Sequence, residues 1–453
     1  MSSTPALRPG QLLRILGAGF GIAVVVGGTI GTGILRAPGS IAAQLGDARW
    51  IVAVWCIGGL YTLLGAASLA DLGTAVPRSG GFYVYARRAL GEYPGFAIGW
   101  ADWITNCAGI AIGAMTFGEF ASLLFPALAP YRTLVGAATI VAFSALQIRG
   151  MRVSSRVQEV TSFLKALLFM ALIAALLVLP RSSSGAVATA SPISAFSLAG
   201  PVAVVIALQL VLQTYDGWQS ALYFAGEDTA PARNLPRSMI GGVVVVIAVY
   251  LLMNLALLHV LSIGDLARST LPAADAAERV LGSRGATIIV ALSAFSLLPL
   301  ISAVMLTAPR ILYAMANDGL IPPSVGLVNR ASAPAVALAL SAGAALLLLA
   351  TRTFEVMSAL SAFFAVASYA GAFVSLLVLR RREPALPRPF RVWGYPWTTL
   401  VVLAGSLAFL GGMVVSTPRI SLIALAVLAA SYLVYRMARA SRRGTGGGGA
   451  DGG

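Results

Sequence analysis

One lysine is the most unusual chemical group in this sequence. Lys165 is the only lysine in the chain, and it lies inside a largely apolar run at 163–180. A charged side chain at the centre of a lipid-embedded helix costs roughly 2.5–3.5 kcal/mol on insertion scales, so such residues usually face the protein interior and serve a function. We therefore expect Lys165 to be buried, either as a fixed cation that binds a partner group, as a group that exchanges a proton, or as the structural partner of an acid.

Two apolar segments are interrupted by residues that suit a helix poorly. The first interruption is GGTIGTG at 27–33, and the second is QTYDGW at 213–218. Glycine weakens a helix and permits unusual dihedral angles, and aspartate is well suited to cap a helix that restarts. An open helix N-terminus attracts an anion and an open C-terminus attracts a cation, so two facing breaks would suit a zwitterion. Glycine also serves close packing between membrane helices, so 27–33 could instead be a packing surface.

These segments belong to a chain that is apolar along most of its length. Of its 453 residues, 58% are hydrophobic and only 10% are charged, and the mean hydropathy is +0.88. A soluble protein of this length could not bury so much apolar surface, whereas a run of about 18 residues is enough to cross a bilayer. We therefore expect an all-α polytopic membrane protein with about twelve transmembrane helices. The expected spans are 14–44, 50–76, 94–125, 131–148, 156–180, 199–225, 237–262, 284–315, 334–350, 354–379, 396–416 and 420–438.

The positions of the two interruptions suggest an internal repeat. They fall at the same point of the first and sixth spans, as in an inverted repeat of five plus five helices, and paired interruptions mark the central site of a transporter. The expected parts are a cytoplasmic N-terminal segment, a first five-helix repeat, a second inverted repeat, two further helices and a disordered glycine-rich tail. Their residue ranges are 1–13, 14–180, 199–379, 396–438 and 439–453.

Basic residues are distributed unevenly between the connections. The net charge of +15 could suggest nucleic acid as a partner. However, if the N-terminus is cytoplasmic, about 2.5 times as many arginines fall on the cytoplasmic side as outside, which agrees with the positive-inside rule. We therefore expect a multi-pass protein of the cytoplasmic (inner) membrane with both termini in the cytoplasm, in contact with lipid and with no nucleic acid.

The residues in the spans favour a carrier over an enzyme or a channel. Cys56 and Cys107 lie in apolar helices, and Asp102 is either a buried polar contact or a proton site. An enzyme would need clustered His, Cys and Asp or paired carboxylates, and a channel would need polar rings on several helices. The sequence indicates no cofactor, no metal site and no obligate partner chain.

Four stretches of the sequence, between about Leu12 and Arg391, read VGGTIGTGILRAPG, VPRSGGFYVYARRALGEYPGFAIGW, QTYDGWQSALYFAGEDTAPARNLPRSM and TAPRILYAMANDGLIP. In this order they resemble the amino acid–polyamine–organocation (APC) superfamily, and among its members bacterial amino acid permeases similar to the L-type amino acid transporters. The resemblance implies a LeuT-like fold, alternating access, and an L-amino acid held between the broken first and sixth spans.

The resemblance also implies which groups bind the substrate. Backbone amides after the first break would bind its carboxylate, and backbone carbonyls at both breaks would receive its ammonium. The implied amide donors are Gly31, Thr32 and Gly33. The implied carbonyl acceptors are Thr29, Gln213 and Asp216. The full set of implied substrate-binding residues is Thr29, Ile30, Gly31, Thr32, Gly33, Gln213, Thr214, Tyr215, Asp216 and Trp218.

Lys165 matches the fifth-span lysine of family members that work without sodium. Its ammonium would take the place of a sodium ion and bridge the first span to a hydroxyl of the eighth span, assigned to Ser296 with Ser293 as the alternative. Proton symport would follow if Lys165 loses and regains a proton during transport, and exchange or facilitated diffusion would follow if it stays charged. Gln213 and Asp216 depart from the family pattern, and Asp216 could pair with a cationic side chain. The alternative function is therefore exchange of polyamines or cationic amino acids.

Overall fold

The structure is a computed structural model that describes residues 12–180 and 196–446. Within these ranges the protein is built from helices, and one isolated β-bridge joins Leu16 to Asp228. The α-helices are α1 (Ala18–Thr29), α2 (Gly33–Leu45), α3 (Ala48–Ala75), α4 (Phe82–Leu90), α5 (Glu92–Leu124), α6 (Arg132–Ile148), α7 (Met151–Val178), α8 (Phe196–Tyr215), α9 (Pro231–Val260), α10 (Ile263–Arg268), α11 (Pro272–Leu281), α12 (Gly285–Asn317), α13 (Ala335–Thr351), α14 (Phe354–Arg382), α15 (Trp397–Ser416) and α16 (Pro418–Gly446). The short 3-10 helices are η1 (Pro126–Tyr131), η2 (Ser220–Phe224), η3 (Gly282–Arg284) and η4 (Pro323–Gly326).

The helices agree in part with the predicted spans. Over the described ranges, nine helical segments are long and apolar enough to cross a membrane, and the bent pair α1–α2 makes a tenth. These ten coincide with ten of the predicted spans. The other two predicted spans, 199–225 and 334–350, coincide with α8 followed by η2 and with α13, which has 17 residues. The structure thus confirms an all-helical polytopic protein with a broken first span, and the count of twelve spans stays a prediction.

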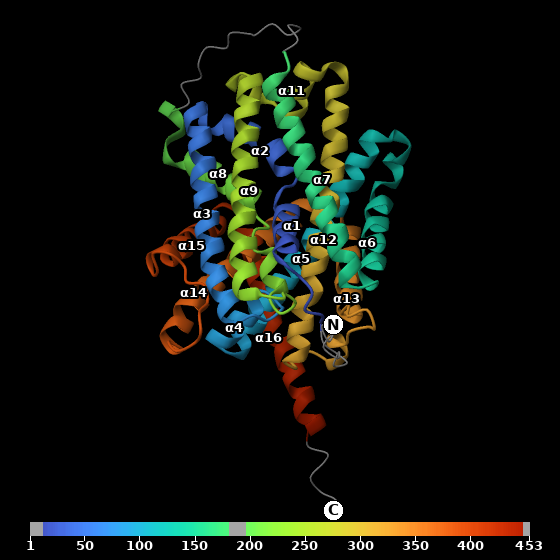
Figure 1. Ribbon diagram of the computed structural model, residues 1–453, viewed down its shortest axis with the longest axis vertical. Coiled ribbons are helices and arrows are strands. Elements are labelled where there is room, and N and C mark those ends of the chain that lie inside the picture. The colour runs from blue at the N-terminus through green and yellow to red at the C-terminus, as the bar shows by residue number, and fades with distance from the viewer. Residues whose placement is uncertain (1–11, 181–195, 447–453) are drawn as a thin grey trace, which may run out of the picture.

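Contacts between helices divide much of the bundle into two groups. The first group contains α1, α3, α8, α9 and η2, and the second group contains α5, α6, α12 and α13. Helix α7 lies between them and contacts α1 and α9 as well as α6 and α12. Figure 1 shows α1 in the middle of the bundle, with α9, α7 and α12 around it. The first break therefore lies where the two groups meet.

The two ends of the bundle carry the short helices and the end of the chain. Figure 1 shows α11 at one end, and α4 with the projecting end of α16 at the other. Helix α16 continues to Gly446, past the predicted span limit at 438. Alanine and arginine in 436–443 favour a helix, which accounts for the extension. The rest of the predicted disordered tail, 447–453, lies outside the described residues, as do residues 1–11 of the predicted N-terminal segment.

A buried carboxylate ties the connection between α14 and α15 to the end of α3. Asp71 on α3 is fully buried and forms ion pairs with Arg380 and, at 3.1 Å, with Arg388. The same carboxylate accepts a hydrogen bond of 2.8 Å from the backbone N–H of Val392. Because a buried charge is tolerated only when it is paired and hydrogen-bonded, these contacts explain why Asp71 can lie inside the protein.

Candidate functional site

The first span is broken at the predicted position. Helix α1 ends at Thr29 and α2 begins at Gly33, and their axes differ in direction by 47°. Ile30 has an extended backbone, with ψ near 105°. Within the described residues, no acceptor is found for the backbone N–H groups of Gly31, Thr32 and Gly33. The break therefore leaves open donors at the N-terminus of α2, where the helix dipole favours an anion.

Lys165 occupies the acceptor side of the same break. Its side chain on α7 is fully buried, and Nζ donates to the carbonyl oxygen of Gly27 at 2.8 Å and to that of Ile30. In a continuous helix these carbonyls would accept from the backbone N–H groups four residues further along. The Lys165 side chain thus replaces two backbone donors that the break removes, and it satisfies two carbonyl oxygens that would otherwise be buried without a partner.

The sixth span is broken at a glycine that touches the first break. Helix α8 ends at Tyr215, and η2 begins at Ser220 after a turn that contains Gly217. Gly217 has φ of +112°, a conformation that favours glycine. A Cβ atom at this position would lie 2.6 Å from the carbonyl oxygen of Gly28, which is too close for any side chain. The backbones of the two breaks therefore pack directly against each other.

A tyrosine on α9 joins the two breaks through one hydroxyl group. The Tyr250 hydroxyl lies 2.9 Å from the carbonyl oxygens of both Thr29 and Thr214, and the side chain is fully buried. A phenol has one proton, so the hydroxyl donates to the two carbonyls in turn or shares its proton between them. Sequence reasoning missed Tyr250. The one feature of the sequence that could have identified it is that it is the only tyrosine in the largely apolar segment Pro231–Val260.

Two of the predicted residues of the second break, Asp216 and Trp218, contact α14. Asp216 is exposed and accepts a hydrogen bond from the hydroxyl of Tyr369 on α14. Trp218 is 5% exposed and packs with its ring centroid 5.4 Å from that of Tyr369. Gln213 is exposed, whereas Tyr215 is buried and donates to the carbonyl oxygen of Trp55 at 3.3 Å. Asp216 and Trp218 therefore meet at Tyr369, and Tyr215 points away from them toward α3.

The predicted hydroxyl partners of Lys165 are not hydrogen-bonded to it. Ser296 and Ser293 are both fully buried on α12. The Ser296 hydroxyl donates to the Ser293 carbonyl oxygen at 2.9 Å, and the Ser293 hydroxyl has no partner among the described residues. Helix α12 does pack against α1 and α7. The bridge from Lys165 to α12 therefore stays a prediction, and the observed contacts of the ammonium are with α1.

A buried ion pair joins the segment after η2 to α12, across the interface between the two groups of helices. Glu227, just after η2, is fully buried and pairs with Arg310 on α12 at 2.6 and 2.7 Å. The guanidinium of Arg310 also lies 4.4 Å from the ring centroid of Phe224 and donates to the sulfur of Met151 at 3.1 Å. The Ser79 hydroxyl adds a hydrogen bond of 3.2 Å to Glu227. Sequence reasoning did not pair Glu227 with Arg310, because nothing in their spacing links residues 83 positions apart.

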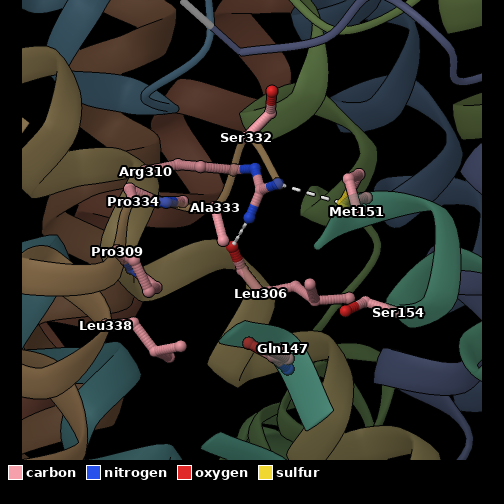
Figure 2. Close-up of a pocket in the computed structure, with 10 residues that line it drawn as sticks. All are labelled: Gln147, Met151, Ser154, Leu306, Pro309, Arg310, Ser332, Ala333, Pro334 and Leu338. Carbon is pink, nitrogen blue, oxygen red and sulfur yellow. Dashed lines mark hydrogen bonds between the residues drawn. The ribbon is translucent and has the colours of Figure 1, made fainter. Parts of the chain in front are cut away.

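A small pocket lies beside this ion pair. Figure 2 shows the Arg310 side chain crossing it toward Met151, with Leu306 and Ser154 below. None of its lining residues belongs to either break, and Lys165 does not line it. The pocket therefore lies outside the predicted substrate site, next to Arg310 of the buried ion pair.

Comparison with known proteins decides the family. The family model described as amino acid permease matches residues 21–437, which includes both breaks, Lys165, Glu227 and Arg310. The chain belongs to the amino acid permease family of the APC superfamily. This permease is a multi-pass membrane protein that transports amino acids, and it is not an enzyme.

Similar curated proteins are themselves amino acid transporters. The permease is 29% identical to the serine/threonine exchanger SteT of Bacillus subtilis over 416 residues, 89% of this chain and 92% of the relative. It is 29% identical over 381 residues to the Asc-type amino acid transporter 1 of Mus musculus, 82% of this chain and 71% of the relative. It is 28% identical over 380 residues to the large neutral amino acids transporter small subunit 2 of Homo sapiens, 82% of this chain and 70% of the relative.

We expect Gly217→Ala to separate the two breaks of the permease. A Cβ there meets the backbone of Gly28 and must also adopt a positive φ, which together cost about 1–3 kcal/mol or more. Uptake in proteoliposomes should fall at least about tenfold, since 1.4 kcal/mol corresponds to a factor of ten. The matched control is Gly241→Ala on α9, where no atom lies within 4 Å of the added Cβ. Equal uptake by the two variants would contradict the contact between the breaks.

We expect Tyr250→Phe to weaken transport without unfolding the permease. The substitution keeps the ring, which packs 4.9 Å from that of Tyr215, and removes only the hydroxyl that reaches Thr29 and Thr214. One lost hydrogen bond is worth about 1 kcal/mol, so the apparent affinity should fall about fivefold. Isothermal titration with purified protein measures this, and Tyr432→Phe on the half-exposed face of α16 is the control. An unchanged affinity would show that the Tyr250 hydroxyl does not stabilise the substrate-binding arrangement of the two breaks.

Proposed function

We propose that this permease is a sodium-independent secondary transporter of L-amino acids in the cytoplasmic membrane, working by alternating access. In this proposal twelve spans form two inverted five-helix repeats, 14–180 and 199–379, followed by two further helices at 396–438. Both termini lie in the cytoplasm. The distribution of arginines, the breaks at corresponding points of α1–α2 and α8–η2, and the division of the helices into two groups support this arrangement.

The substrate backbone is bound by the open backbone groups of the breaks. The free N–H groups of Gly31, Thr32 and Gly33 receive its carboxylate, because they point from a helix N-terminus and have no acceptor of their own in the described residues. The carbonyls of Thr29, Gln213 and Asp216 receive its ammonium. Thr29 already accepts from Tyr250 and Gln213 accepts from the backbone of Asp216, but a carbonyl oxygen has a second lone pair.

The substrate side chain is bound by residues near the turn between α8 and η2. Ile30 and Trp218 supply apolar surface, while Thr214 and Tyr215 set the shape of the wall behind the breaks. The similar proteins are named for exchange of serine and threonine or for transport of large neutral amino acids. We therefore propose neutral L-amino acids, with serine and threonine first, as the substrates.

One observation carries the proposal of sodium independence. The Lys165 ammonium donates to the carbonyls of Gly27 and Ile30, the kind of oxygen ligand that a sodium ion would need at an unwound helix. A fixed cation already in this place leaves no role for sodium. In this proposal the hydroxyl of Ser296 or Ser293 on α12 accepts a third hydrogen bond from the Lys165 ammonium at another stage of the cycle. Both serines lie on a helix that packs against α7.

A second function is favoured by one acidic residue. Asp216 is exposed at the turn, where its carboxyl group accepts a hydrogen bond from the hydroxyl of Tyr369. An acid in this position would attract an ammonium or guanidinium group on a substrate. Exchange of polyamines or cationic amino acids is therefore the alternative, and inhibition of serine uptake by lysine or putrescine, lost in Asp216→Asn, would support it.

Reconstitution into proteoliposomes tests the proposal directly. Vesicles loaded with unlabelled L-serine are expected to take up labelled L-serine by counterflow, with saturation, preference for the L-isomer, and the same rate in sodium and in choline buffer. Absence of counterflow with any of the twenty amino acids would overturn the proposed activity. A requirement for sodium would overturn the proposed role of Lys165.

A further inference from the structure

Another buried acid lies beside η2 and has no part in the substrate site proposed above. Asp102 on α5 is 2% exposed. Its Oδ1 accepts from the Tyr223 hydroxyl of η2 at 2.7 Å and from the Asn106 side-chain amide at 3.1 Å. Its Oδ2 is buried and has no hydrogen-bond partner in the described part of the chain. Oδ1 therefore has two hydrogen-bond donors, whereas Oδ2 has none among the described residues and is the oxygen at which a proton can bind.

In the part of the chain that the structure describes, no cation forms an ion pair with this carboxyl group. The titratable groups that face it are Tyr223 of η2, Tyr369 of α14 and Asp216 of the α8–η2 turn. From α12, Thr307 reaches only as far as Asn106, whose amide oxygen it contacts at 2.6 Å. No arginine or lysine of the described residues forms an ion pair with Asp102. A buried carboxylate without a counter-ion is strongly disfavoured, so the neutral acid is the form that fits this environment.

The Tyr223–Asp102 hydrogen bond spans the interface between the two groups of helices. Tyr223 belongs to η2 in the first group, and Asp102 belongs to α5 in the second group. Any motion that separates the groups at this point removes the Tyr223 donor and admits water to the carboxyl group. Hydration favours the charged form of a carboxyl group, so separation would release the proton.

We propose that Asp102 carries a proton through the transport cycle, bound at Oδ2 in the closed arrangement and released when η2 moves away from α5. The proposal rests on the alternating access proposed above, and it deepens it by naming the coupling ion and its site. Lys165 is given no part in this proton transfer, because both of its described contacts are hydrogen bonds to carbonyls of the break, which hold it in place. Each cycle would then move one proton together with the amino acid, from the side where Asp102 is protonated to the side where it is released.

Infrared spectroscopy tests the protonation state without any transport. Purified protein at pH 7 is expected to show the C=O band of a protonated carboxyl group, and Asp102→Asn should lose that band. The matched control is Asp275→Asn, which removes an exposed acid on α11 and should leave the band in place. A wild-type spectrum without the band, or a band that persists in Asp102→Asn, would overturn the proposal even if the protein transports amino acids.

Transport in proteoliposomes tests the coupling. An inward proton gradient is expected to drive accumulation of L-serine by wild type, whereas Asp102→Asn should lose at least about 90% of this accumulation and keep counterflow. Asp102→Asn with wild-type accumulation would overturn the proposal. If that variant does not fold, Tyr223→Phe keeps the acid and removes its donor, so the carboxyl band should move in frequency. An unmoved band in Tyr223→Phe would then overturn the assignment. Failure of counterflow in wild type would instead count against the proposed function.

Discussion

A Lys165→Ala variant is expected to fold and insert but to take up amino acid at about one-tenth of the wild-type rate or less. The substitution removes the donor to the carbonyls of Gly27 and Ile30, which are buried at the break. Each unsatisfied buried polar group costs about 1–3 kcal/mol, and tenfold in rate corresponds to about 1.4 kcal/mol. The backbone at the break would then become helical or be hydrated by water. In either case the N–H groups of Gly31 to Gly33 would no longer be positioned to bind the substrate.

Initial rates of L-serine counterflow measure the effect. The matched control is Phe163→Ala on the same helix, because Phe163 is 73% exposed on the face of α7 away from the break. The control should keep its uptake. Wild-type counterflow by Lys165→Ala, at equal protein content and with the same elution volume, would show that the ammonium does not support the site.

A Glu227→Gln variant is expected to show the largest loss of stability. Glu227 is fully buried and Arg310 is 4% exposed at its side chain, so the substitution leaves a guanidinium inside the protein without its counter-ion. Removing one partner of a buried ion pair costs about 3–5 kcal/mol, which is a large fraction of the stability of a typical protein. The midpoint of thermal unfolding in detergent should therefore fall by several degrees.

The exposed ion pair between Arg88 and Glu383 provides the matched control. Its side chains are 40% and 33% exposed, so Glu383→Gln should cost less than about 1 kcal/mol. The hydrogen bond from Arg88 lowers the pKa of the Glu383 carboxyl. The small contribution of this pair is therefore present above the ordinary glutamate pKa and is lost as pH falls through the lowered value. Equal destabilisation by the two variants at pH 7 would contradict the structural importance of the buried pair.

The buried polar contacts also show how the two groups of helices hold together in this arrangement. Tyr223 and Asp102, Glu227 and Arg310, and Lys165 with the α1 carbonyls all join helices that are distant in the sequence. Such contacts are strong only while water is excluded from them. Alternating access would require some of them to break, which makes them natural places for coupling to substrate or to protons.

Hydropathy alone was sufficient to predict an all-helical polytopic membrane protein, because a bilayer demands long apolar helices whatever their packing. The broken first span could also be predicted, since glycine at 27–33 weakens the helix locally. The burial of Lys165 followed from the same logic, because a lone cation in an apolar run must avoid lipid. These features depend on composition and spacing along one segment, which the sequence contains in full.

Only the tertiary structure decided which polar groups meet. Tyr250 reaches both breaks, and Tyr369 reaches Asp216, because of how α9 and α14 are rotated about their axes. The same packing leaves Ser296 bonded to its own helix and not to Lys165. Rotation and crossing angle result from the fit of all neighbouring side chains at once, and a change of one residue in register moves a side chain by 100° around its helix. No pattern along a single helix contains that information.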